Sequence, residues 1–299
     1  MFLILSGYGL YKTYKSSAVE FYKKSFKKLY STYWLIWLLF VPPGVFYFHR
    51  TFDIVYGTNI IGKFLANLFG VHLFFGFWGY NPTWWFMSLI IALYILFPLF
   101  YKLFKNNYNA VFLTVISFLI SITPQLTLLP KFGFVFCFAA SFVFGMLLAK
   151  FNIIEKIKEK INKVSGKDKI FLIFPFCIII LYLCYLRIYY VGTGEAGSFT
   201  IVDVFLAWLV IQFVFSITRN YKNIFVKFLE LLGENSFSIF LFHTFIYGIY
   251  FYSYVYSLKY AILIFPAFTI CCLVIALIIS KIQTIINLIP LKMQQIFNK

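Results

Sequence analysis

Proton transfer near neutral pH is the chemistry that histidine performs most readily, and this chain holds only three histidines. One of them, His243, lies inside the apolar string SIFLFHTFIY. An ionisable group in such a setting is costly unless it faces the interior of a helix bundle or a water-filled cavity. His243 is therefore the first candidate for a catalytic base. The alternative is a neutral histidine that hydrogen-bonds Ser236, Ser238 or a neighbouring helix.

The second candidate is His72, in the apolar stretch 60 to 77. The spacing predicts a helix with one apolar stripe. The stripe consists of Ile61, Phe64, Leu65, Leu68, Phe69 and His72. Such a helix lies in the membrane interface or re-enters the membrane. His72 is then either a catalytic residue or a histidine whose hydrogen bonds are satisfied at the interface.

The third histidine, His49, precedes Asp53 by four residues, and the two would meet on a helix. Pro42 and Pro43 lie just upstream and are expected to break the helix. We therefore interpret His49, Arg50 and Asp53 as an interfacial cluster of charges rather than a catalytic pair.

Asp203 is the carboxylate with the most unusual position, because it lies one turn into an apolar helix. Arg187, near the end of the preceding helix, is its nearest candidate partner, with Glu195 as a competitor. The pair is either a structural clamp between two helices or a polar wall of a substrate cavity, which makes both residues candidates for substrate binding.

Long apolar helices must position these side chains. Eight apolar stretches are each about 20 residues long, the length that crosses a hydrocarbon core of about 30 Å. They are residues 29 to 48, 83 to 101, 110 to 128, 131 to 149, 170 to 190, 200 to 218, 236 to 256 and 260 to 280. The sequence thus predicts an all-α, polytopic transmembrane bundle, organised as a single membrane-embedded domain over residues 1 to 299.

The composition supports a membrane protein, since 63% of the residues are hydrophobic and 12% are charged. Most of the basic residues fall on alternate connections, so the net charge of +17 does not indicate nucleic-acid binding. These connections are 12 to 28, 102 to 109, 150 to 169, 219 to 235 and the tail from Lys281. The positive-inside rule makes them and the C-terminus cytoplasmic, in the plasma or inner membrane. His243 would then lie about two turns from the cytoplasmic end of its helix.

Residues 2 to 11 are apolar but form only half a membrane span. Either an upstream segment completes this half helix, or it packs among the other helices. The five cysteines lie in apolar helices without a metal-binding spacing, so we expect packing residues and no metal.

Three strings in order resemble the acyltransferase 3 family of integral membrane O-acyltransferases: LSGY before a basic segment, TWWFMSLIIALYILFPLF from residue 83, and GENSFSIFLFHTFIY from residue 233. The resemblance implies ten transmembrane helices and transfer of an acyl group, usually acetyl from acetyl-CoA, to a sugar or lipid-linked glycan. It also implies that the first helix, with an Arg and a catalytic His, is lacking here. Where many members have a Glu after the Trp motif, this chain has Ile90.

The resemblance implies a membrane O-acetyltransferase that acts on a cell-surface or exopolysaccharide sugar. Trp85 would help to shape the substrate entrance, and Lys12, Lys24 and Lys28 would bind the phosphates of acetyl-CoA. Alternatively, these lysines only set the orientation of the chain in the membrane, where they lie next to anionic lipid headgroups. Two alternatives remain open: a transporter or polymerase of polysaccharide or lipid-linked sugar, and an inactive, truncated relative.

Overall fold

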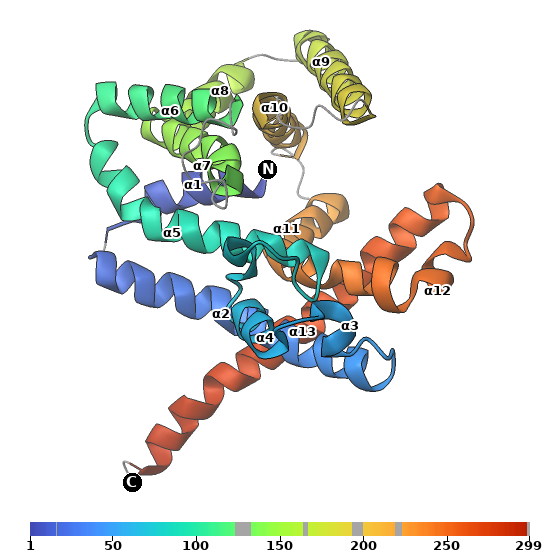
Figure 1. Cartoon of the computed structure of the whole chain (residues 1–299). Helices are drawn as coiled ribbons and strands as arrows, with labels where there is room; N and C mark the ends of the chain where they lie inside the picture. The colour runs from blue at the N-terminus through green and yellow to red at the C-terminus, as the bar shows by residue number, and fades with distance from the viewer. Residues whose placement is uncertain (16, 123–132, 164–166, 193–199, 219–222, 298–299) are drawn as a thin grey trace. The chain divides into compact units, whose positions relative to one another are not determined.

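The structure, a computed structural model, describes every residue except 16, 123–132, 164–166, 193–199, 219–222 and 298–299 (Figure 1). The described residues form helices and no strands. The α-helices are α1 Phe2–Thr13, α2 Ala18–Phe46, α3 Phe52–Tyr56, α4 Ile60–Leu68, α5 Trp85–Leu103, α6 Asn107–Ile122, α7 Gly133–Lys150, α8 Ile153–Lys163, α9 Lys167–Gly192, α10 Thr200–Thr218, α11 Ile224–Thr244, α12 Tyr252–Tyr256 and α13 Ala261–Phe297. Two short 3₁₀ helices, η1 (His72–Phe75) and η2 (Pro82–Trp84), precede α5, and a π-helical turn, η6 (Phe245–Tyr250), follows α11.

Several of these helices are long and apolar enough to cross a bilayer. Within the described residues four meet that standard: Ala18–Phe46, Pro82–Leu103, Gly133–Lys150 and Ala261–Ile286. Shorter apolar helices cover Asn107–Ser121, Pro175–Tyr189 and Val202–Val214. Each predicted apolar stretch overlaps a helix of the described residues, and the predicted class, an all-α polytopic membrane bundle, is confirmed.

Both ends of α2 differ from the prediction. The basic segment before residue 29 is not a loop, because α2 already begins at Ala18. Lysine is a good helix former, so a charged turn can extend a spanning helix beyond the bilayer. The prolines at 42 and 43 lie inside α2, which ends at Phe46. His49 follows with a left-handed φ of 51°, so His49 and Asp53 do not share a helix.

The predicted start of the helix that carries His243 is wrong. The helix that carries it begins at Ile224 rather than at residue 236, because the charged residues Lys227, Glu230 and Glu234 are helical as well. His243 therefore lies about five turns from the start of α11 instead of two. The helical path continues beyond Thr244 as the π-turn η6.

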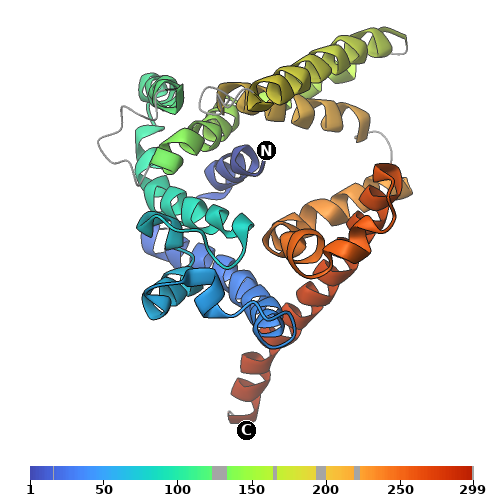
Figure 2. The same cartoon turned by 45° about the vertical axis from the view of Figure 1, so that its right-hand side comes forward.

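The contacts divide the chain into two compact units, and the first comprises Met1–Phe21 and Leu89–Asn223. Helix α1 packs along α7 in this unit, and the two helices lie side by side in both views (Figures 1 and 2). The backbones approach closely at two glycines. A Cβ added to Gly7 would lie 2.1 Å from the carbonyl oxygen of Phe142, and one added to Gly145 would lie 2.1 Å from that of Ile4. The N-terminal half helix is thus a packed part of this unit.

This close approach predicts a stability difference between two glycines of one helix. Gly7→Ala should destabilise the protein by about 1–3 kcal/mol, because the added methyl group overlaps the α7 backbone. Gly9→Ala is the matched control, since a Cβ there meets nothing within 4 Å. Alanine is also the better helix former, so Gly9→Ala should leave the melting temperature unchanged or raise it. Thermal unfolding of the two purified variants in detergent measures the difference, and equal melting temperatures would contradict the packing.

The second unit comprises Tyr22–Ser88 and Ile224–Lys299. Hydrogen bonds between distant segments hold it together. Gln283 Nε2 donates to Thr32 Oγ1 at 2.8 Å, which joins α13 to α2, and Tyr250 Oη donates to the carbonyl of Phe40 at 2.7 Å. Both His72 and His243 belong to this unit.

Candidate functional site

A fully buried asparagine organises the polar groups between α4 and α5. Tyr56 Oη donates to Asn67 Oδ1 at 2.6 Å, and the backbone N–H of Tyr80 donates to the same oxygen at 2.7 Å. Tyr33, from α2, donates its hydroxyl to the carbonyl of Asn67. The side chain and the backbone carbonyl of Asn67 therefore tie together three segments of the second unit.

These bonds determine which nitrogen of His72 carries the proton. A backbone N–H can only donate, so the atom of Asn67 that it faces is the oxygen, and the other atom is the NH₂ group. That NH₂ group lies 3.4 Å from Nδ1 of His72. Since Asn67 donates in this contact, Nδ1 must accept. The proton of the neutral ring is therefore on Nε2.

The Nε2–H group of His72 is a buried donor without a partner among the described residues. The side chain of His72 is fully buried, and burial lowers its pKa to about 4, so the ring is neutral at pH 7. Buried donors in folded proteins are nearly always paired, and an unpaired one calls for an explanation such as a ligand or a water. Gly79 stands beside this nitrogen: a Cβ there would lie 3.0 Å from Nε2.

The predicted helical stripe that ended at His72 is wrong. Helix α4 ends at Leu68, and Gly70, with a φ of 68°, turns the chain before His72 begins η1. The stripe residues Ile61, Leu65 and Phe69 are exposed, while Asn67 is buried. The apolar face of α4 thus points outward and suits contact with lipid, and the polar group points inward.

Two of the strings quoted above meet in space. Trp84 Nε1 donates to the carbonyl of Leu241 at 2.9 Å, and Asn81 Nδ2 lies 3.4 Å from the same oxygen. The hydroxyls of Thr83 and Thr244 are 3.1 Å apart. Hydrogen bonds therefore join the segment just before α5 to the end of α11. His243 lies at the level where α5 begins.

His243 has the opposite proton arrangement from His72. Its Nδ1 lies 2.9 Å from the carbonyl of Phe240 and 3.2 Å from that of Ile239, both in the preceding turn of α11. Carbonyl oxygens only accept, so Nδ1 carries the proton. Nε2 of the neutral ring then keeps its lone pair and can accept a proton. A backbone carbonyl on Nδ1 is a common way to orient a histidine for such a role.

A chain of contacts connects the two histidines. Trp84, bonded to α11, packs on Tyr33 with ring centroids 5.0 Å apart, and Tyr33 in turn contacts Asn67. Within the described parts of the second unit, no hydrogen bond or ring contact joins His72 and His243 directly. The structure therefore links the two histidines only through Trp84, Tyr33 and Asn67 and does not bring them into contact.

The predicted partnership of Arg187 and Asp203 is confirmed. Arg187 Nε donates to Asp203 Oδ1 at 2.6 Å, which clamps α9 to α10 in the first unit. The competing Glu195 lies outside the described residues. Trp85, predicted to shape a substrate entrance, is half-buried, whereas its neighbour Trp84 is fully buried and makes the bond to α11.

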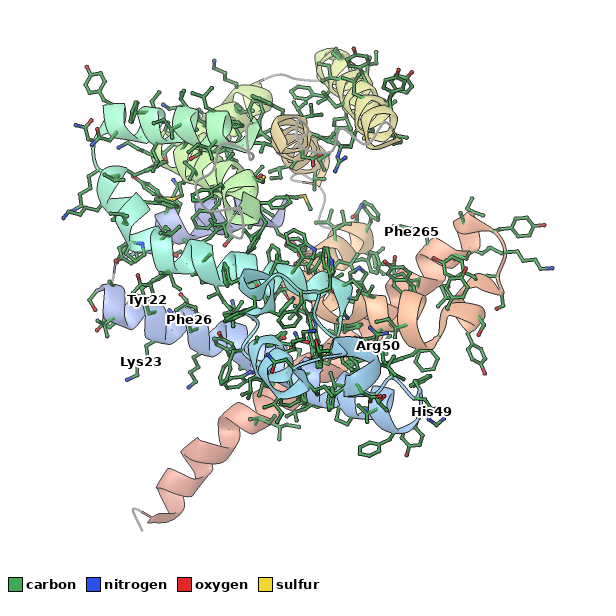
Figure 3. The ribbon with its side chains drawn as sticks, viewed as in Figure 1. Tyr22, Lys23, Phe26, His49, Arg50 and Phe265 are labelled. Atoms are coloured by element: carbon green, nitrogen blue, oxygen red, sulfur yellow. The ribbon has the colours of Figure 1, made fainter. Side chains whose placement is uncertain are left out.

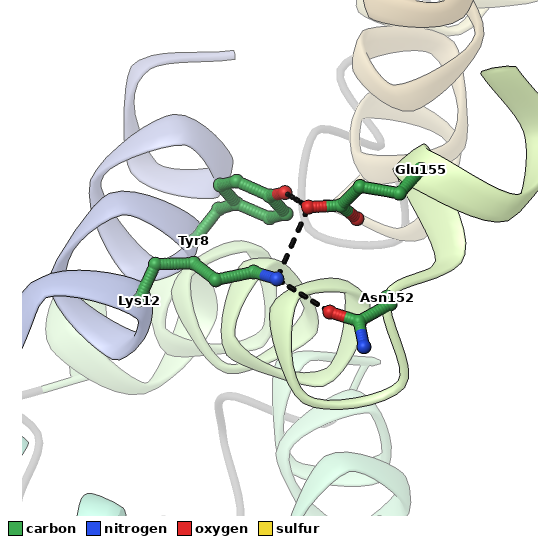
Figure 4. A network of polar contacts seen from close by, with 4 residues as sticks. All are labelled: Tyr8, Lys12, Asn152 and Glu155. Carbon is green, nitrogen blue, oxygen red and sulfur yellow. Dashed lines mark hydrogen bonds and ion pairs between the residues drawn. The ribbon is translucent and has the colours of Figure 1, made fainter.

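The three lysines predicted to bind a cofactor have different surroundings. Lys12 forms an ion pair with Glu155 at 3.0 Å and also donates to Asn152, in a network that Tyr8 joins (Figure 4). Lys24 and Lys28 are exposed on α2, four residues apart and so on one face. The labelled side chains of Lys23 and Phe26 mark this part of α2 in Figure 3. Of these three lysines, Lys24 and Lys28 have no carboxylate partner among the described residues.

Sequence analysis overlooked two residues of this region. Asn67 is an amide in an apolar stretch, which is a usable signal of a buried polar contact, because such a group must find partners there. The sequence places Arg50 in an interfacial cluster of charges and gives no sign of its contacts with Tyr80. In Figure 3 it lies in the crowded cluster beside α3, whereas the exposed His49 stands at the rim. The guanidinium carbon of Arg50 lies 5.1 Å from the ring centroid of Tyr80.

One of three comparisons with known proteins gave a match. A search of curated proteins and a search of solved structures gave no match. A family model described as an acyltransferase domain matches residues 1–281, which is nearly the whole chain. The matched region includes both histidines of the second unit and the strings that meet at Trp84 and Leu241. This chain therefore belongs to the acyltransferase 3 family and is a membrane acyltransferase.

Proposed function

We propose that this protein transfers an acetyl group from acetyl-CoA to a hydroxyl of a cell-surface or exopolysaccharide sugar, with His243 as the general base. The observation that carries the proposal is the pair of carbonyls, of Phe240 and Ile239, that hold the proton of His243 on Nδ1. This leaves the lone pair of Nε2 available for the hydroxyl proton. The family supplies the class of reaction, and acetyl and sugar are the finer part of the proposal.

The reaction needs three contributions from the protein. His243 Nε2 takes the proton as the sugar oxygen bonds to the thioester carbonyl carbon. The Nε2–H group of His72 donates a hydrogen bond to a substrate oxygen, which would account for a buried donor that has no partner among the described residues. When the carbon–sulfur bond breaks, the departing thiolate of CoA takes the proton back from His243, so that the products are acetyl ester and CoA thiol.

The exposed lysines of α2 are the groups that we assign to the cofactor. Lys24 and Lys28 present two ammonium groups on one face, suited to phosphates arriving from the cytoplasm. We retain the orientation from the charge pattern, with this segment and the C-terminus inside the cell. CoA carries its thioester at the end of a long pantetheine arm, so its phosphates and acetyl group can lie at different depths. Trp85 remains a proposed contact of the acceptor, whereas we assign the Arg187–Asp203 pair of the first unit to the clamp between α9 and α10.

Labelled acetyl-CoA tests the proposal in membranes from cells that express the full chain. The expected result is label in an alkali-labile ester on the glycan fraction, at a level well above that of membranes without the chain. Glycan that accumulates across the membrane without acetyl label would instead indicate a transporter. Label on protein or on phospholipid alone would contradict the sugar acceptor.

A further inference from the structure

Arg50 is a half-buried cation to which the described part of the chain supplies no carboxylate. Its Nη2 donates to the carbonyl of Tyr80 at 3.0 Å, and its guanidinium lies over the ring of the same tyrosine. Its Nε is buried and has no hydrogen-bond partner among the residues that the structure describes. The nearest acidic residue in sequence, Asp53, is exposed and hydrogen-bonds Thr51 instead. The charge of Arg50 is thus held in place but not neutralised.

The position of Arg50 is fixed from both sides. Its backbone N–H donates to the carbonyl of Gly44 at 2.9 Å, and its carbonyl accepts from Tyr80 Oη at 2.7 Å. An arginine that only reaches for bulk water or headgroups needs no such anchoring, since its long side chain can extend to the interface. A preorganised guanidinium is the usual receptor for a phosphate or a carboxylate, because its planar fork of donors matches them.

A second cation lies on the same group of aromatic rings. Tyr80, Phe52, Tyr56 and Phe77 form a continuous series, with ring centroids 6.0 to 6.2 Å apart. Arg50 covers the ring at one end of the series, and Lys63 lies 5.8 Å from the centroid of Phe77 at the other. Lys63 Nζ donates to the carbonyl of Tyr56 at 2.5 Å and, like Arg50, has no carboxylate among the described residues.

Lys63 belongs to α4, whose apolar side chains are exposed. Ile61 is 76% exposed and Leu65 is 44% exposed, which suits contact with a lipid chain. A cation and an apolar face on one short helix, with a second cation on the adjoining aromatic rings, fit a molecule with an anionic head and a long hydrocarbon tail. Aromatic faces also suit the apolar faces of a sugar ring.

We propose that Arg50, assisted by Lys63, binds the phosphate group of a lipid-linked glycan, so that the acceptor of the acyl group is presented on a polyprenyl phosphate carrier. This inference rests on the proposed function for the identity of the acceptor, but the binding step itself does not depend on acyl transfer. The Nε–H and the remaining N–H groups of Arg50 would meet the phosphate oxygens, and the prenyl chain would lie along the exposed face of α4.

Binding of farnesyl phosphate, compared with farnesol, tests the site on the full chain. Native mass spectrometry in an uncharged detergent should show the phosphate bound at least about tenfold more tightly than the alcohol, which corresponds to about 1.4 kcal/mol. Arg50→Gln should remove this preference, and Arg50→Lys should retain part of it, because the charge remains while the fork of donors is lost. Lys259→Gln is the matched control, since Lys259 is an exposed cation of the same unit, and it should change nothing.

A second arm distinguishes a carrier phosphate from the headgroup of an ordinary lipid. The same titration in phosphatidylcholine nanodiscs, with and without phosphatidylglycerol, should give the same affinity for farnesyl phosphate. Loss of binding when phosphatidylglycerol is added would mean that the cations serve bulk headgroups, and this would overturn the proposal. Equal binding of phosphate and alcohol by the wild-type protein would overturn it as well, whatever the variants do. Neither result bears on acetyl transfer, which is measured separately.

Discussion

Replacing His243 by asparagine should lower the rate of acetyl transfer about 10³-fold, because general-base catalysis typically contributes 10²- to 10⁴-fold. Asparagine can place its amide N–H where Nδ1–H now bonds the carbonyl of Phe240, so the end of α11 should keep its structure. It has no lone pair at the position of Nε2. The rate is measured with labelled acetyl-CoA on purified protein, at acetyl-CoA concentrations above and below KM.

The loss should appear in kcat rather than in KM, since the proton transfer occurs only in the reaction. A small buffer base supplies the control: imidazole added to His243→Ala should restore part of the rate, with a dependence on the fraction of neutral imidazole. If His243 were purely structural, its replacement would not lower kcat selectively, and imidazole would not restore the rate. Retention of wild-type kcat in His243→Asn would remove His243 from the mechanism.

Two similar substitutions of His72 should lower the activity to different extents. His72→Gln places an amide N–H near the position of Nε2 and should retain activity within about tenfold. His72→Asn keeps an oxygen facing the NH₂ group of Asn67 but lacks the distal donor, and should lose about 10²-fold, the typical cost of removing one preorganised donor. Labelled-acetyl assays on the two purified variants make the comparison. Equal loss in both would contradict a donor role.

The pH dependence of stability provides the matching structural readout. Burial holds the pKa of His72 at about 4 in the folded protein, against about 6.5 in the unfolded chain. A depressed histidine pKa stabilises the fold above pH 6.5, and this contribution is lost as the pH falls from about 6.5 toward 4, because the unfolded chain binds the proton first. His72→Gln should therefore unfold with a weaker pH dependence in this window than the wild-type protein does.

The sequence predicted the features that follow from one-dimensional patterns. Apolar stretches of spanning length predicted the helices, and a lone acid and a lone arginine near adjacent helix ends predicted the bond between Arg187 and Asp203. Both predictions, of the helices and of the ion pair, rest on the high cost of unpaired polar groups in an apolar environment. The positions of such groups can be read from the sequence. The family followed from strings in order, and the match over residues 1–281 confirms it.

The candidate site was harder to predict, because it depends on where helices end and on what meets across them. The apolar spacing of 60 to 77 suits one helix, but α4 ends at Leu68 and the chain turns at Gly70, so His72 does not share a helix with the apolar stripe. The start of α11 depended on charged residues that are compatible with either a loop or a helix. The protonation of His72 follows only from the orientation of Asn67, which Tyr80 fixes from another segment.

The most direct test is acetyl transfer by the purified chain in liposomes, with labelled acetyl-CoA and a lipid-linked glycan as the only acceptor. CoA thiol released and acetyl ester formed on the glycan are counted in the same samples, beside His243→Asn. We expect the two products in equal amounts from the wild-type protein, and about 10³-fold less of both from the variant. Equal yields from the two proteins, or CoA released without ester on the glycan, would contradict a sugar O-acetyltransferase that uses His243 as its base.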